Sequence, residues 1–461
     1  MSIIGAFIVP HPPIILPEIG RGEERKIRKT IDAYREVGRR VAALKPETVV
    51  VTSPHSVMYA DYFHISPGKR ASGNFSAFRA PEAGEEAEYD TEFVEMLTRE
   101  AGRENLPAGT FGEKSRELDH GTMIPLRFLH EFCRDFRVVR IGLSGLSASA
   151  HYRLGRCIAQ TAEKLDRRTV FVASGDLSHK LTETGPYGFA PEGPEFDGQV
   201  TQAMRDGDFA RFLSFDADFC DAAAECGLRS FQIMAGALDG VAVKPELLSY
   251  EGPFGVGYGV ATFAVEGKDE ARRFLEGYEK RRRGQLDARK AGEDEYVRLA
   301  HLSLETCVKN GRRPVLPEGL PEEMKAVRAG AFVSLKKDGR LRGCIGTIEP
   351  VTGSVAEEIL RNAVSAGTED PRFDPVEENE LDDLVYSVDV LSVPEPVRSA
   401  AEFDAKRYGV IVTKGRRRGL LLPDLAGVDT PREQIDIAKQ KAGISPREAC
   451  SLERFEVTRH R

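Results

Sequence analysis

The first part of the chain alternates short apolar runs, rich in β-branched residues, with segments of helical periodicity. This pattern is typical of a buried sheet whose strands are connected by crossover helices. A helix is predicted over residues 25–44, because apolar side chains recur there at spacings of three and four. The strands predicted for this part cover residues 3–9, 48–52, 136–143 and 169–173. We therefore predict an α/β domain with a mixed sheet flanked by helices.

The apolar rhythm breaks near residues 267–292, where charged residues and the basic run 280–283 are concentrated. We interpret this basic run as a solvated helix face or a linker rather than as an interaction tail. The predicted division is a first domain over residues 1–267, a linker over 268–290 and a second domain over 291–461.

The second domain is predicted to be a smaller α+β domain. A helical stretch around residues 295–307 is followed by strands, and Asp338-Gly339 between two apolar runs is the chemistry of a tight hairpin turn. A second hairpin is predicted around Lys414-Gly415. Thr430-Pro431 with Glu433 predicts a helix start, because threonine caps, proline tolerates the first turn and glutamate completes a capping box.

Composition narrows the class of partner. The 461 residues carry a net charge of −8, which gives no basic footprint for nucleic acid or for an anionic membrane surface. Small-molecule or protein partners are expected instead. The apolar stretch 3–10 lacks preceding basic residues and is too short for a signal core, and the seven cysteines form no CxxC pair. We therefore expect a cytoplasmic protein without a disulfide framework.

Three histidines follow predicted strands. His11 comes after the first strand, His55 after the second, and His179 after the strand 169–173 and a short turn. Ligands of open α/β sheets bind outside the carboxyl ends of the strands, so these side chains are expected to converge. Pro10 and Pro12 flank His11, and Pro54 precedes His55, which holds both imidazoles out of helix. Two imidazoles with one carboxylate form the arrangement that suits non-haem Fe(II).

The ordered motifs of this domain resemble the LigB-like class III extradiol dioxygenases, which also include the Memo proteins. The resemblance covers most of residues 1–265 and rests on five motifs. These are Pro10-His11-Pro12, Ser53-Pro54-His55, Asp119-His120-Gly121-Thr122, Ser174-Gly175-Asp176-Leu177-Ser178-His179 and Glu225-Cys226-Gly227-Leu228-Arg229-Ser230.

The resemblance implies a function and a ligand set. His11, His55 and Glu225 would hold one Fe(II) ion, His179 would act as acid and base, and His120 would contact substrate or bound oxygen. The implied reaction is extradiol cleavage by O2 of a catechol-like, metal-chelating small molecule. Histidine suits a proton transfer near neutral pH.

The third metal ligand has an alternative. The Memo proteins place a cysteine where the dioxygenases use glutamate, and this chain carries both, as Glu225-Cys226. A carboxylate favours oxygen-activating Fe(II), whereas the Cys226 thiolate favours Cu or Zn. A third interpretation makes Glu225 the cap of the following helix, with Cys226 as small buried filler. The alternative function is a Memo-like iron- or copper-binding protein without ring cleavage.

The second domain resembles the AMMECR family through residues 341–347 and Asp370-Pro371-Arg372-Phe373. The resemblance names a fold without a reaction. Cys344 beside Arg342 is either a reactive thiolate or a small packed side chain. The fusion resembles the AmmeMemoRadiSam systems, which implies a radical S-adenosylmethionine protein as pathway partner.

Overall fold

The computed structural model describes residues 2–114, 117–312, 314–399, 402–425 and 427–461. They form two compact units, Met1–Arg282 and Arg283–Arg461. Among the described residues, no helix has the length and apolar character needed to cross a membrane.

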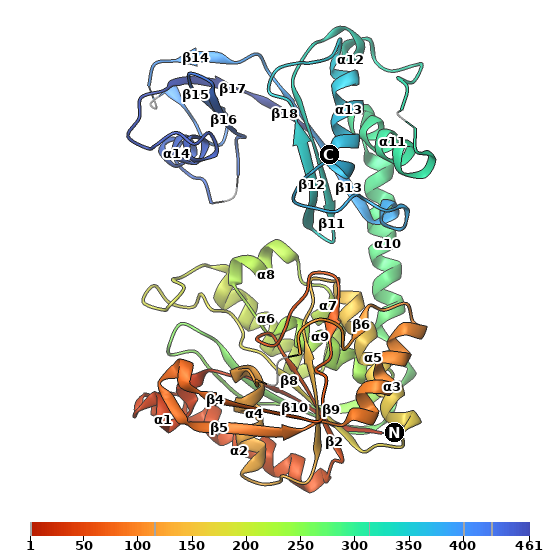
Figure 1. The fold of residues 1–461 in the computed structure, drawn as a ribbon, viewed down its shortest axis with the longest axis vertical. Coiled ribbons are helices and arrows are strands. Elements are labelled where there is room, and N and C mark those ends of the chain that lie inside the picture. Colours follow the sequence, from red (N-terminus) through yellow and green to blue (C-terminus); the bar gives the residue numbers. More distant parts are fainter. Residues whose placement is uncertain (1, 115–116, 313, 400–401, 426) are drawn as a thin grey trace. The chain divides into compact units, whose positions relative to one another are not determined.

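A six-stranded mixed sheet is the centre of the first unit (Figure 1). Its order is β7-β2-β8-β1-β10-β9, in which β7, β2, β8 and β1 are parallel, whereas β10 pairs antiparallel with both β1 and β9. The strands are β1 (Ile3–Val9), β2 (Thr48–Ser53), β7 (Arg137–Gly142), β8 (Thr169–Ser174), β9 (Val241–Glu251) and β10 (Tyr258–Lys268). The predicted mixed sheet is confirmed, and its four parallel strands match the four predicted runs.

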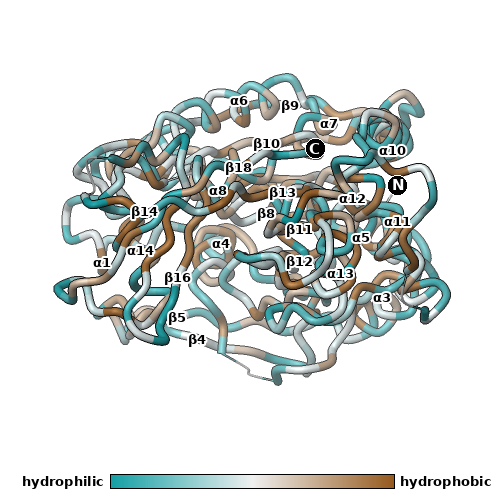
Figure 2. The backbone as a smooth tube through the Cα atoms, turned by 90° about the horizontal axis from the view of Figure 1, so that it is seen from above, coloured by the Kyte–Doolittle hydropathy of each residue, from teal (hydrophilic) through white to brown (hydrophobic). Residues whose placement is uncertain are grey.

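Strands β1, β2 and β8 are buried on both sides because helices cover both faces of this sheet. One hydrophobic core joins the sheet to α2 (Arg28–Leu44), α4 (His120–His130) and the hairpin of β4 (Arg70–Phe75) and β5 (Ala80–Glu88). The other core joins it to α3 (Thr91–Arg103), α5 (Ala148–Lys164), α6 (Glu192–Asp206), α7 (Phe209–Leu213), α8 (Ala217–Ala223) and α9 (Leu228–Ala237). Figure 2 shows hydrophobic and hydrophilic residues alternating along the outer helix α6.

The short elements of the first unit are α1 (Pro17–Gly20), β3 (Phe63–His64) and β6 (Ala108–Gly109). The range predicted as a linker carries a long helix, α10 (Phe274–Gly292), whose residues divide between the two units. Its basic run is helical, in keeping with the interpretation as a helix face.

The second unit contains two four-stranded antiparallel sheets, ordered β12-β11-β13-β18 and β14-β17-β15-β16. The strands are β11 (Ala331–Lys337), β12 (Arg340–Gly346), β13 (Leu384–Leu391), β14 (Glu395–Val397), β15 (Gly409–Lys414), β16 (Arg417–Leu421), β17 (Ser451–Phe455) and β18 (Val457–His460). The helices are α11 (Glu295–Asn310), α12 (Glu322–Ala326), α13 (Val355–Thr368) and α14 (Pro431–Lys441). Helices α11 and α13 share a core with the first sheet, and α14 shares one with the second.

Two local predictions for this unit are confirmed. Asp338 and Gly339 connect β11 to β12 with φ values of 51° and 79°, as the predicted primed turn requires. The Thr430 side chain accepts a hydrogen bond from Glu433 N, and the Glu433 carboxylate in turn accepts one from Thr430 N, which is the predicted capping box.

Candidate metal centre

His11 is fixed in place by backbone contacts at the end of β1. Its side chain is only 1% exposed, and its backbone N–H donates to Asp176 Oδ1 over 2.8 Å. The buried Tyr34 hydroxyl donates to the carbonyl of Pro10 over 2.6 Å. The loop after β1 is therefore tied both to α2 and to the loop after β8, which leaves the imidazole little freedom to move.

Ser174, the last residue of β8, determines the tautomer of His11. Its hydroxyl donates to the carbonyl of Gly121 over 2.6 Å, so its single proton is committed there. The same oxygen lies 2.9 Å from His11 Nδ1 and must therefore accept a proton from that nitrogen. His11 consequently carries its proton on Nδ1 and presents the lone pair of Nε2, as a metal ligand needs.

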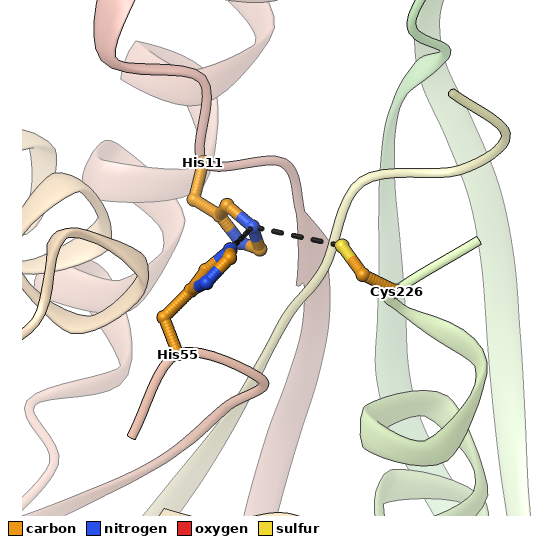
Figure 3. Close-up of side chains that lie close together, drawn as sticks. All are labelled: His11, His55 and Cys226. Atoms are coloured by element: carbon orange, nitrogen blue, oxygen red, sulfur yellow. Dashed lines mark hydrogen bonds between the residues drawn. The ribbon is translucent and has the colours of Figure 1, made fainter. Parts of the chain in front are cut away.

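His55 follows β2, and its imidazole lies against that of His11 (Figure 3). Its Nε2 lies 3.0 Å from His11 Nε2, and its side chain is exposed whereas that of His11 is buried. The Ser53 hydroxyl accepts from the backbone N–H of His55 over 3.2 Å and donates to Asp119 Oδ1 over 2.5 Å. The two imidazoles follow β1 and β2, parallel strands that both pair with β8, and they lie side by side, as their positions after strands predicted.

Cys226 completes a group of three potential ligands (Figure 3). Its Sγ lies 3.7 Å from His11 Nε2, and the three ligand atoms lie within 4.8 Å of one another. Two nitrogen ligands about 2.1 Å from one ion are separated by about 3.0 Å at a right angle and about 3.4 Å at the tetrahedral angle. A sulfur ligand about 2.3 Å from the same ion is about 3.6 Å from each nitrogen at the tetrahedral angle. The separations of His11 from His55 and from Cys226 therefore fit one transition-metal ion.

Glu225 is engaged elsewhere. Its Oε2 accepts the backbone N–H of Leu228 over 2.7 Å at the first turn of α9, and burial raises the pKa of its carboxyl. Within the described part of the chain, the structure groups Cys226 with the two histidines and does not include Glu225 in that group. It thus places the two candidate third ligands differently: Cys226 beside the two histidines and Glu225 at the helix terminus.

Protonation in the metal-free protein follows from burial. Desolvation lowers the pKa of His11 well below its usual value and also lowers that of His55, so both imidazoles are neutral near pH 7. Burial raises the pKa of the Cys226 thiol well above its usual value. An ion bound at this site would have to displace the Cys226 proton, which makes binding favoured by high pH.

His120 lies beside the pair without belonging to it. As the first residue of α4 it places its ring centroid 4.0 Å from that of His55 and 5.5 Å from that of His11. Burial lowers its pKa to about 3, so the ring is neutral at physiological pH. Phe78 packs edge-on against it at 5.1 Å. A neutral imidazole here can donate or accept a hydrogen bond to a molecule bound next to His55.

A backbone carbonyl determines which ring nitrogen of His179 carries the proton. Its Nδ1 donates to the carbonyl of Ala224 over 2.6 Å, which leaves Nε2 as an acceptor. Ala224 adopts the left-handed conformation, with φ of 53°, at the end of α8. Such a backbone costs an L-residue of order 1–2 kcal/mol, so the surrounding structure holds that carbonyl towards His179. Tyr187 stands edge-on to the ring at 5.2 Å.

The histidines depend on residues to which the sequence analysis gave no role. Ser174 selects the His11 tautomer, Asp176 binds the His11 backbone, and Ser53 with Asp119 holds the His55 loop. Burial raises the pKa of Asp176 to about 6. All four residues lie inside the five quoted motifs, so their proximity to the histidines was a usable signal.

The residues predicted as a second-domain site are arranged separately. Arg342 donates to both carboxylate oxygens of Glu380, over 3.1 and 2.8 Å, and to the carbonyls of Asp374 and Pro375. The Cys344 sulfur instead accepts from the Ser334 hydroxyl over 3.2 Å. The Arg342 guanidinium therefore has a complete set of structural partners that does not include the thiol.

Comparisons with known proteins identify both units. Residues 5–261 match the family model of the catalytic LigB subunit of aromatic ring-opening dioxygenase. The chain belongs to the LigB family. Its residues 297–460 match the AMMECR1 model, so the predicted combination of a LigB-like domain with a C-terminal AMMECR domain is confirmed.

Some relatives match this LigB-family chain over its whole length, and others match one part of it. A protein of Clostridium acetobutylicum is 42% identical over 469 residues, covering 100% of each chain. A Thermotoga maritima protein is 54% identical over 172 residues, which are 37% of this chain and 99% of that protein. A crystal structure of an uncharacterized Pyrococcus horikoshii protein covers 36% of this chain and 88% of its own, at 32% identity and a TM-score of 0.34.

Proposed function

We propose that the LigB-type domain is a metal-binding domain that holds one iron or copper ion through His11, His55 and Cys226, without ring cleavage. One observation carries the proposal: the Cys226 sulfur lies 3.7 Å from His11 Nε2, while Glu225 caps α9. The facial set of two histidines and a carboxylate belongs to oxygen-activating Fe(II) sites, whereas thiolate is a softer ligand that holds copper or zinc strongly.

The chain's own groups prepare this site for an ion. Ser174 keeps the Nε2 lone pair of His11 available, and desolvation, strongest at His11, lowers the pKa of both imidazoles. A bound ion would supply Lewis acidity and, for iron or copper, one-electron redox chemistry. The exposed side of His55 leaves the site reachable from solvent.

Metal analysis of adjacent variants tests the ligand set. The full-length protein, purified without oxygen and loaded with Fe(II) or Cu(I), is expected to bind one equivalent. Cys226→Ala should lose that ion, whereas Glu225→Gln should keep it, because glutamine still offers an oxygen to Leu228 N. Cys133→Ala is the matched control for removal of a cysteine from the same unit. Loss of the ion in Glu225→Gln with retention in Cys226→Ala would overturn the proposal.

A second candidate function is extradiol cleavage of a catechol-like compound. Two imidazoles support it. His120 is neutral beside His55, and the hydrogen bond of His179 to Ala224 uses Nδ1 rather than Nε2. Such groups can receive a proton from a diol and return one to a leaving oxygen. The Fe(II)-loaded protein would then consume O2 with a catechol, and His179→Ala would stop consumption while retaining the ion. Absence of O2 uptake across a broad catechol panel, with iron bound, would leave the metal-binding proposal alone.

A further inference from the structure

A buried arginine stands behind the metal centre. Arg140, in the middle of β7, is 3% exposed. Its Nε donates to the Ser66 hydroxyl over 2.6 Å, and its Nη1 donates to the carbonyl of Glu117 over 2.7 Å. A buried charge is tolerated only when hydrogen bonds and an opposite charge compensate it.

The counter-charge is Asp119, whose Oδ2 lies 3.8 Å from Arg140 Nη1. Asp119 is the N-cap of α4: Oδ1 accepts from Thr122 N over 3.0 Å, and Oδ2 accepts from the Thr122 hydroxyl over 2.8 Å. Oδ1 also accepts the Ser53 hydroxyl. One carboxylate therefore joins the arginine, the helix terminus and the loop that carries His55.

The first turn of α4 touches both histidine loops. Asp119 reaches the His55 loop through Ser53, and the Gly121 carbonyl reaches His11 through the Ser174 hydroxyl. A Cβ on Gly121 would lie 2.4 Å from Ser53 Oγ, so the turn packs against that loop without spare room. Residues 119–121 thus cross-link the two metal-binding loops and also carry His120.

We infer that Arg140 is a positioning residue for this metal centre. Its guanidinium holds the turn from two sides, by the charge of Asp119 and by the carbonyl of Glu117. When it is held there, the first turn of α4 sets the 3.0 Å separation of His11 Nε2 from His55 Nε2 and the orientation of the His120 ring. The inference rests on the proposed metal site and adds a residue that touches no ligand atom of that site.

Cobalt binding provides a readout that separates positioning from mere folding. Co(II) bound to a thiolate shows charge-transfer and d–d absorption that report coordination geometry. The full-length wild type, Arg140→Met, Arg140→Lys and Arg137→Met are compared by Co(II) titration and by thermal unfolding. Arg137→Met is the matched control, because Arg137 begins the same strand and is exposed. Wild type that binds no Co(II) at His11, His55 and Cys226 defeats the proposed function itself.

Arg140→Met is expected to fold and to weaken Co(II) binding about 10- to 100-fold, as loss of outer supports does at other metal sites, with altered d–d bands. Arg140→Lys should recover part of both, and Arg137→Met should match wild type. An Arg140→Met protein with wild-type affinity and spectrum overturns the inference while the metal site stands.

Asp119→Asn keeps the test decisive if Arg140→Met does not fold. Asparagine also caps helices, so this variant retains the turn but removes the charge that Arg140 faces. It is expected to weaken Co(II) binding, and its combination with Arg140→Lys should cost less than the product of the two single effects. Fully multiplicative effects, or no effect of Asp119→Asn on affinity and spectrum, would overturn the inference.

Discussion

His11 Nδ1 donates to Ser174 Oγ over 2.9 Å, and this one contact decides which nitrogen of His11 is available to an ion. Ser174 has no second proton to offer, because its hydroxyl is donated to Gly121. The relationship links the end of β1 to the end of β8, two neighbours in the sheet that are separated by more than 160 residues in the sequence.

Ser174→Ala is therefore predicted to weaken metal binding about 10- to 100-fold, the usual cost of losing a partner of a metal-bound histidine. The ring of His11 would lose both its tautomer and its orientation. Competition with a chromogenic chelator measures the affinity, and Ser76→Ala, at an exposed site of the same unit, is the control. Equal affinities for the two variants would contradict the assignment of the tautomer.

Glu225→Ala is predicted to destabilise the protein by about 1 kcal/mol through loss of a helix cap, while metal stoichiometry stays unchanged. The backbone N–H of Leu228 would lose its carboxylate acceptor. Urea unfolding of Glu225→Ala and Glu225→Gln separates the two effects, since the glutamine variant should retain most of the stability. A glutamine variant as unstable as the alanine variant would show that the cap hydrogen bond is not what Glu225 supplies.

The buried carboxyl of Asp197, which binds the backbone beside His179, leads us to expect a pH dependence of stability. Burial raises the pKa of this carboxyl to about 7, although it accepts from Tyr250 and from the Ser178 backbone. Between about pH 4 and pH 7 the folded chain keeps a proton that the unfolded carboxyl, with a pKa near 3.9, has lost. Stability from this group must therefore fall as the pH rises through that interval, and level off above pH 7.

Asp197→Asn should remove this contribution. The difference in unfolding free energy between wild type and variant is expected to change with a slope of up to about 1.4 kcal/mol per pH unit from pH 5 to pH 7. Urea unfolding at pH 5, 6, 7 and 8 gives the slope. Parallel pH profiles of the two proteins would contradict the raised pKa.

Removal of the ion is predicted to lower the melting temperature of the metal-loaded protein. An ion that binds only the folded state stabilises it by mass action, by about 2.7 kcal/mol at a free concentration one hundred times its Kd. Calorimetry with and without chelator measures the shift. Cys226→Ala should melt at one temperature under both conditions, and a chelator shift as large as that of wild type would remove Cys226 from the ligand set.

Arg342→Ala is predicted to destabilise the second unit by about 2 kcal/mol, because Glu380 loses its bidentate partner and keeps only Lys337. The pKa of Glu380, held at about 2 although burial opposes this, should rise in the variant. Arg340→Ala, at an exposed position of the same strand, is the control. Circular dichroism during urea unfolding reports the change, and equal stability of both variants would show that the Arg342 contacts contribute little.

Local chemistry made much of the fold predictable. β1 covers Ile3–Val9 as predicted, and β2 and β8 each extend only one residue beyond the prediction, because buried parallel strands appear as continuous β-branched runs. The antiparallel β9 had no such signal, because Lys244, Glu246 and Ser249 interrupt it, and β10 was not predicted although its first six residues are buried. Helix α10 was assigned to a linker because its charged residues leave almost no apolar stripe.

The candidate site was predictable in part for a different reason. His11 and His55 follow parallel strands, and the geometry of such sheets brings strand ends together. Which side chain of the pair 225–226 turns to them depends on the backbone between α8 and α9, where Ala224 is left-handed. No periodicity in the sequence records that rotation, so residue types alone left both ligands open.

The unequal exposure of His11 and His55 implies an order in which a proposed ion would meet its two histidine ligands. An ion arriving from water meets His55, which is exposed, before it reaches His11, which is sealed behind it. In the proposed function, His55 would be the first ligand that an ion meets, and His11 with its Ser174 contact would hold the ion from the interior. Metal exchange at such a centre would take place on the side of His55, while the opposite side stays closed to solvent.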